Sequence, residues 1–155
     1  MSTDEILQKI YLFHEFTRDE IHLIAGIVKE KNLHENETLF NEGNDAESMF
    51  VVQYGTLKIS RALESGSEVS ITNISAGEHL GELPYIDGQK RSANVEATEK
   101  TQLLEIFYTD LKKVLESHPA IELKFYKAIC NYFVTRMRTL TSDLTFAREL
   151  KKRYS

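Results

Sequence analysis

The sequence predicts a mainly β domain with flanking helices, built around an antiparallel sandwich or jelly roll. Two observations predict this class. Between residues 37 and 107, short β-rich runs alternate with turn residues, whereas apolar residues on either side of this range recur at helical spacing. A chain of 155 residues can bury about two-thirds of its unfolded surface, so we expect one domain over residues 1–155.

Residues 1–31 are expected to form N-terminal helices. Thr3 with Asp4 is predicted to cap the first helix, and Thr17 with Glu20 forms a capping box before the second. The apolar positions at helical spacing are Ile6, Leu7, Ile10, Phe13, Ile21, Ile24, Ile27 and Val28.

Six strands are expected in the barrel range 37–107. They are predicted at 37–40, 48–54, 56–63, 68–74, 92–98 and 102–107. The stretch GELPYIDGQK at 81–90 interrupts them and is too long for a tight hairpin. Because proline is tolerated in the first turn of a helix, Pro84 favours a short helix at this point.

Two helices are predicted over residues 109–150. Thr109 is expected to cap the first, which ends before Pro119, and a segment of about thirty residues follows. Its apolar stripe is too long for a small β body to cover, so we expect part of it to meet a partner helix. The stripe consists of Phe125, Ile129, Phe133, Met137, Leu140, Leu144 and Ala147.

Composition and charge exclude several classes of protein. The single cysteine, Cys130, excludes an internal disulfide and a cysteine-rich metal site, and favours a reducing cytoplasm. No signal peptide or membrane span is predicted. The net charge is −5, with −10 over residues 1–120 and +5 over 121–155, so the body would repel nucleic acid. We interpret the basic C-terminal segment as a solvated helix face.

A candidate anion site lies on either side of the predicted short helix. Gly81-Glu82-Leu83 precedes it, and Arg91-Ser92-Ala93 follows eight residues later. Arg91 could clamp an anion bidentately, Ser92 could donate a hydroxyl, and Glu82 could accept from a sugar hydroxyl, so a sugar phosphate suits this set. The alternative is that Arg91 and Glu82 form an ion pair across a loop.

The run GEHLGELPYIDGQKRSANVEA resembles the phosphate-binding cassette of the cyclic-nucleotide-binding domain family, most closely its catabolite-activator (Crp/Fnr-like) branch. Turn glycines at 43, 55 and 77 and the LFHEF run agree with this family, and the resemblance covers nearly residues 10–150. It implies a double-stranded β-helix barrel, N-terminal helices, a short cassette helix and a long C-terminal helix. It also implies a regulatory sensor that binds cAMP or, less favoured, cGMP.

The resemblance assigns roles to five positions of the cassette. Arg91 matches the arginine that pairs with the cyclic phosphate, Ser92 the adjacent donor, and Glu82 the carboxylate that accepts from the ribose 2′-hydroxyl. Gly81 and Leu83 shape the cassette helix and its amides, which are expected to contact the phosphate from Gly81 to Tyr85. Pro84 departs from the family pattern because it has no N–H to donate.

The final helix covers the base in this family, and two alignments leave its contact residues open. An ungapped alignment brings Arg136 and Met137 to the base, whereas one extra helical turn brings Leu140 and Thr141. Arginine can stack on a purine, and threonine can hydrogen-bond to it.

The implied partners follow from the same resemblance. We expect a homodimer through the C-terminal helix, with Phe133, Met137, Leu140 and Leu144 in its seam, and an unidentified effector protein or output domain. The winged helix-turn-helix of catabolite activators has no counterpart here, so sequence-specific DNA binding is not expected, nor is a membrane partner. We expect no enzymatic activity, metal or cofactor.

Three other functions compete with a cyclic-nucleotide sensor. A cupin-like metalloenzyme is disfavoured because the histidines at 14, 22, 34, 79 and 118 lack the spacing of such a site, and His79 and His118 are interpreted as surface or capping residues. A ligand-independent dimerising scaffold of the same fold stays open because of Pro84 and the undefined lid. A sensor of another ligand would have no use for Glu82, Arg91 and Ser92.

Overall fold

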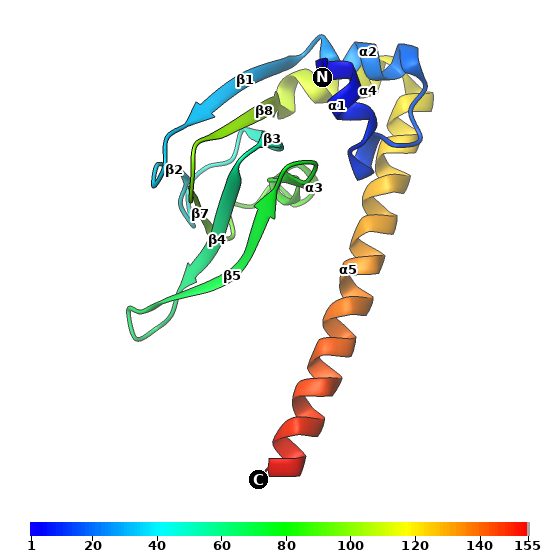
Figure 1. Ribbon diagram of the computed structural model, residues 1–155. Coiled ribbons are helices and arrows are strands. Elements are labelled where there is room, and N and C mark those ends of the chain that lie inside the picture. The colour runs from blue at the N-terminus through cyan, green and yellow to red at the C-terminus, as the bar shows by residue number, and fades with distance from the viewer. Residues whose placement is uncertain (155) are drawn as a thin grey trace.

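The computed structural model describes residues 1–154, and its N-terminal part is helical as far as Ala25 (Figure 1). Helix α1 (Thr3–Gln8), a short 3-10 turn η1 (Tyr11–Phe13) and helix α2 (Arg18–Ala25) follow one another. The capping box of Thr17 and Glu20 is confirmed. The predicted cap at Thr3 and Asp4 is wrong, because Ser2 caps α1 and forms a capping box with Glu5.

Eight strands form two four-stranded antiparallel sheets, which confirms the jelly-roll class. One sheet has the order β1-β8-β3-β6 and the other β2-β7-β4-β5. The strands are β1 (Val28–Leu33), β2 (Thr38–Phe40), β3 (Ser48–Tyr54), β4 (Thr56–Ala62), β5 (Glu68–Ser75), β6 (His79–Leu80), β7 (Asn94–Ala97) and β8 (Thr101–Phe107).

The barrel begins earlier in the chain than the sequence predicts. Residues 28–31, expected to be helical, belong to β1, which pairs with β8 along its whole length from Val28 opposite Ile106 to Leu33 opposite Thr101. Gly26 ends α2, and strand pairing then prevails over the helical spacing of Ile27 and Val28. The residues between Val28 and Leu33 are exposed and mostly charged, so no apolar alternation marks this edge strand.

The short helix between β6 and β7 is confirmed as α3 (Leu83–Asp87), with Pro84 in its first turn. Gly88 ends α3 in a left-handed conformation, with φ of 69°, and its N–H donates to the Pro84 carbonyl. This arrangement places the loop that leads to Arg91 beside the start of the same helix.

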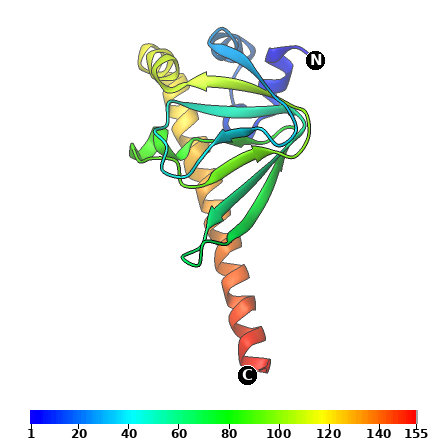
Figure 2. The ribbon, with the colours of Figure 1, turned by 90° about the vertical axis from the view of Figure 1, so that its left-hand side faces the viewer.

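Two helices complete the chain after β8. Helix α4 (Tyr108–Ser117) begins directly after Phe107 and has no side-chain cap, so the predicted cap at Thr109 is wrong. Helix α5 (Pro119–Tyr154) runs for 36 residues and extends well beyond the barrel (Figures 1 and 2). Its buried residues are Ile121, Phe125, Ala128 and Ile129, all in its first third.

Two apolar cores hold these elements together. In the first, the N-terminal helices, α4 and the start of α5 pack against the sheet that contains β3 and β8, with Phe13 stacked 6.2 Å from Phe125 between ring centres. The second fills the barrel around Phe50, Leu57 and Leu103. The first core fixes where α5 leaves the body of the domain. None of the helices in residues 1–154 combines the length and the apolar character needed to cross a membrane.

Candidate functional site

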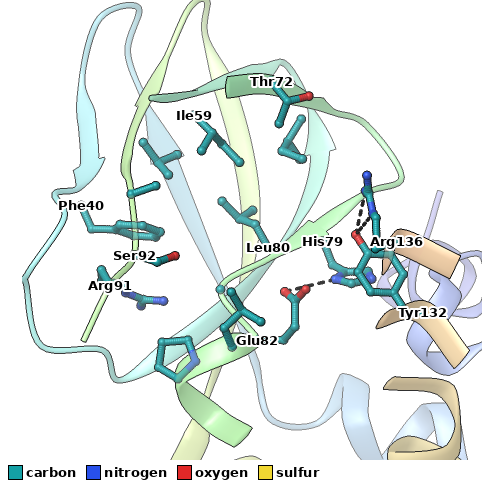
Figure 3. Close-up of a pocket in the computed structure, with 16 residues that line it drawn as sticks. Phe40, Ile59, Thr72, His79, Leu80, Glu82, Arg91, Ser92, Tyr132 and Arg136 are labelled. Atoms are coloured by element: carbon teal, nitrogen blue, oxygen red, sulfur yellow. Dashed lines mark hydrogen bonds and ion pairs between the residues drawn. The ribbon is translucent and has the colours of Figure 1, made fainter. Parts of the chain in front are cut away.

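A cavity of about 210 Å³ opens between the β2-β7-β4-β5 sheet, the α3 segment and α5 (Figure 3). Its wall is apolar on the barrel side, where Ile59, Ile74 and Val95 contribute. Its charged side chains come from two sides, with Arg91 in the loop before β7 on one side and Arg136 of α5 on the other (Figure 3). The complete lining is Phe40, Ile59, Thr72, Ile74, His79, Leu80, Gly81, Glu82, Leu83, Pro84, Arg91, Ser92, Ala93, Val95, Tyr132 and Arg136.

Arg91 is a buried cation, only 6% exposed, in the wall of this cavity. Its Nη2 donates to the Ser48 carbonyl at 2.8 Å, and its guanidinium lies 4.1 Å from the centre of the Phe40 ring. Its Nε has no hydrogen-bond partner among the described residues. Burial lowers the pKa of Arg91, but an arginine side chain keeps its charge at neutral pH. Arg91 therefore places a fixed positive charge in the cavity wall, and its buried Nε has no partner among the described residues.

Gly81 allows the chain to pass close to this guanidinium. Its φ is +86°, and a Cβ at this position would lie 2.9 Å from Arg91 Nη1. Tyr108, the first residue of α4, donates its hydroxyl to the Gly81 carbonyl, and Arg91 Nη1 donates to the same hydroxyl at 3.4 Å. Arg91 is thus held by contacts from three other segments, namely the Phe40 ring of β2, the Ser48 carbonyl of β3 and the Tyr108 hydroxyl of α4.

Glu82 is a buried carboxylate, 6% exposed, in the same cavity wall. Within residues 1–154 it makes no ion pair with Arg91, so the alternative of a loop ion pair is wrong. The Glu82 carboxylate instead faces the His79 imidazole, with 3.3 Å between Glu82 Oε2 and His79 Nδ1 (Figure 3). The cavity wall therefore holds a buried carboxylate, Glu82, and a buried guanidinium, Arg91, that are not paired with each other.

The other predicted cassette residues line the same cavity. Ser92 is exposed beside Arg91, and Leu83 is 45% exposed at the start of α3. Two backbone positions of the cassette offer no free donor, because Pro84 has no N–H and the Tyr85 N–H donates to the Glu82 carbonyl at 3.1 Å. Of the amides expected to contact the phosphate, from Gly81 to Tyr85, those of residues 81–83 are therefore the remaining candidates.

The cavity is bounded on the α5 side by Tyr132 and Arg136. Arg136 donates to the Tyr132 hydroxyl from Nε at 3.1 Å and from Nη2 at 2.8 Å, which holds both side chains at the opening. Of the predicted lid residues, Arg136 lines the cavity. Met137, Leu140 and Thr141 lie further along the exposed part of α5 and do not line it, so their contact with a bound base stays a prediction.

Sequence reasoning missed four residues that shape the site. The interpretation of His79 as a surface or capping residue is wrong, because β6 pairs it with Val51 and turns its ring into the cavity, 5% exposed. Tyr132, Phe40 and Tyr108 were not singled out. Strand β6 has only two residues, so no period indicates His79, and nothing local indicates the other three, which come from distant segments. His118, which contacts the Val114 carbonyl at 2.9 Å, does lie at the exposed end of α4.

Comparison with known proteins identifies the family. The profile of the cyclic nucleotide-binding domain matches residues 30–118, which is more than half of the chain. The chain belongs to the cyclic nucleotide-binding domain family. The resemblance noted from the cassette is therefore confirmed.

Individual relatives of this cyclic nucleotide-binding domain are distant. The cyclic AMP receptor protein of Thermus thermophilus is 26% identical over 110 residues, covering 71% of this chain and 51% of that protein, so the chain matches about half the length of this relative. A cyclic nucleotide-binding domain from Methylobacillus flagellatus has a TM-score of 0.78 at 23% identity, with 88% of this chain and 77% of that chain covered.

The regulatory domain of Toxoplasma gondii PKA, solved with cAMP, has a TM-score of 0.68 at 24% identity, with 72% of this chain and 42% of that chain covered. At these identities the two solved structures show that the fold is shared.

Proposed function

We propose that this domain binds a cyclic nucleotide, preferentially cAMP, and acts as a regulatory sensor in the cytoplasm rather than as an enzyme. The observation that carries the proposal is that Glu82 and Arg91 are both buried in one cavity wall and are not paired with each other. Burying two opposite charges that do not pair with each other costs free energy, and a ligand that supplies an anion to Arg91 and a hydroxyl to Glu82 offsets that cost.

The ligand is placed residue by residue. The cyclic phosphate accepts from the Arg91 guanidinium, from the Ser92 hydroxyl and from the amides of residues 81–83, with Gly81 and Leu83 shaping that segment. Glu82 accepts from the ribose 2′-hydroxyl. The base lies under α5, next to Tyr132 and the planar guanidinium of Arg136, which suits stacking on a purine.

The preference for cAMP is supported by two kinds of observation. The Thermus relative is named a cyclic AMP receptor protein, and the Toxoplasma regulatory domain was solved with cAMP. The Arg91-Ser92-Ala93 run also resembles the form of the cassette that prefers cAMP over cGMP.

Occupancy is transmitted through α5. Tyr132 and Arg136 link the cavity to this helix directly, and Tyr85 of α3 links it a second time through an edge-on contact with Phe125, 5.9 Å between ring centres. A ligand that contacts the two packings of α5 differently shifts the population between them. The exposed stripe beyond the cavity then carries the change to a second copy of the chain and to an effector.

Calorimetric titration with cAMP and cGMP tests the proposal. Arg91→Ala removes the buried cation, and truncating one partner of a buried charge pair costs about 2–5 kcal/mol, or roughly 30-fold to several-thousand-fold in Kd. Lys90→Ala is a matched control, because Lys90 is the neighbouring cation but is exposed and paired with Asp45 at 2.7 Å. We expect its Kd to equal that of the wild type.

A second candidate is the dimerising scaffold that has lost nucleotide binding. The missing donors at Pro84 and Tyr85 favour it, as does the exposed apolar stripe of α5. Absence of cAMP and cGMP binding by the wild-type chain would support the scaffold. Equal binding by the wild type and Arg91→Ala would contradict the placement of the phosphate.

A further inference from the structure

His79 is a buried polar residue of the cavity that the proposed contacts leave unused. Its side chain is 3% exposed and lies in the cavity wall beside Glu82 (Figure 3). Neither of its ring nitrogens has a hydrogen-bond partner among the described residues. An imidazole buried in this way loses its hydrogen bonds to water without replacing them, which costs free energy.

Glu82 has a buried acceptor that lacks a donor, as His79 has a donor that lacks an acceptor. Its Oε2 is buried without a hydrogen-bond partner, and it lies 3.3 Å from His79 Nδ1. This distance is already within hydrogen-bond range, so the contact fails on direction, and a bond forms once the carboxylate oxygen moves towards the plane of the imidazole ring. The two unsatisfied atoms therefore lie within reach of each other, and a change of orientation rather than a long movement joins them.

The surroundings of the His79 ring hold it in position. Its backbone is paired with Val51 of β3, and its ring centre lies 4.6 Å from that of Tyr132 on α5. Tyr132 is in turn fixed by two hydrogen bonds from Arg136. These contacts restrict rotation of the imidazole, so the adjustment that joins the two groups is assigned to the Glu82 carboxylate.

We propose that His79 is a positioning residue that gives this site its selectivity for ribose over 2′-deoxyribose. The proposal rests on the function proposed above. A ring N–H of His79 donates to Glu82 Oε2, and this bond orients the carboxylate so that Oε1 accepts from the ribose 2′-hydroxyl. Without it, the carboxylate is free to rotate and is a poorer acceptor for that hydroxyl.

The test compares the Kd values of cAMP and 2′-deoxy-cAMP in the wild type and two variants. Hydrogen bonds to a charged group are strong, so the wild type should prefer cAMP by roughly tenfold or more. His79→Phe keeps a ring against Tyr132 but has no N–H. In this variant we expect the ratio of the Kd of 2′-deoxy-cAMP to that of cAMP to fall towards one. The fall should come from weaker binding of cAMP, with the Kd of 2′-deoxy-cAMP within about threefold of the wild type.

His79→Gln supplies an amide N–H and should restore most of the preference, which filling of space alone would not do. Glu78→Gln is the matched control, because this carboxylate is one residue away but exposed and outside the cavity. Its preference should equal that of the wild type. If His79→Phe fails to fold by circular dichroism, His79→Leu takes its place.

Three results would overturn the inference alone. The first is that His79→Phe keeps the wild-type preference for cAMP. The second is that His79→Phe weakens the binding of both nucleotides equally and His79→Gln does not restore it. The third is that the wild type binds cAMP in a way that depends on Arg91 but binds 2′-deoxy-cAMP equally well. Failure of the wild type to bind either nucleotide would instead overturn the proposed function, and the inference with it.

Discussion

Gly81→Ala tests how closely the cassette backbone must approach Arg91. The substitution places a Cβ at a position with φ of +86°, which costs an L-residue about 1–2 kcal/mol. The same Cβ would lie 2.9 Å from Arg91 Nη1, and an ordinary contact begins near 3.4 Å, so the guanidinium or the backbone must move by about 0.5 Å. A displacement of that size is enough to spoil a binding geometry.

We therefore expect two separable effects of Gly81→Ala. Thermal unfolding should shift downwards by about 2–4 °C for each kcal/mol lost. The affinity for cAMP should fall by about tenfold or more, because Arg91 is then held less well by the Ser48 carbonyl, to which it donates at 2.8 Å.

Gly66→Ala separates backbone strain from the close contact. Gly66 lies in the turn between β4 and β5 with φ of +87°, and nothing lies within 4 Å of a Cβ built there. This variant should lose a similar amount of stability and keep its affinity for cAMP. The reasoning is refuted if calorimetry gives the two variants the same Kd.

Two further predictions concern the helices. Replacing Leu144, which is 55% exposed on α5, by Glu should turn a dimer into a monomer in sedimentation at micromolar concentration, and a monomeric wild type, with and without nucleotide, would refute the proposed seam. Partial burial raises the pKa of Glu20, but hydrogen bonds from Lys124 and the Thr17 N–H outweigh it, so the pKa is lowered overall. Glu20 therefore stabilises the fold above its unfolded pKa of about 4.3, and this contribution is lost as the pH falls through the lower folded value. Glu20→Gln should be about 0.5–1 kcal/mol less stable in urea at pH 7. An equally large difference at pH 2 would refute this assignment.

The features that the sequence predicted correctly are determined by local chemistry. The Thr17 and Glu20 capping box lies within one turn of chain. Pro84 likewise marks α3 because proline suits the first turn of a helix. Alternating β-rich runs and turn residues identified six of the eight strands for the same reason.

The features that were missed depend on pairing or on long-range packing. Strand β1 carries charged residues on an edge, so its pairing with β8 leaves no apolar alternation to detect. Strand β6 has two residues, too few to show a period, and so the burial of His79 was not predicted. Tyr108 reaches Gly81 from 27 residues away, a proximity that the closed barrel creates.

The contact residues on α5 were ambiguous for a different reason. The first core sets the rotation of this helix through Phe125 and Ile129, and these residues lie before the ones that reach the cavity. An alignment that moves by one turn changes the expected contact from Arg136 to Leu140, and both residues are exposed. Periodicity alone therefore does not fix where the helix passes the cavity.

Because α5 is long, a small movement near the cavity produces a larger displacement at the C-terminal end of the helix. Tyr132 touches His79 near the point where the helix leaves the body, and 22 residues separate it from Tyr154. At 1.5 Å per residue this segment is a rigid arm of about 33 Å. A tilt of about 5° at its base moves the far end by about 3 Å, close to the width of an atom. A rearrangement too small to alter the barrel is therefore large enough to change which side chains of α5 would face a second copy in the proposed dimer.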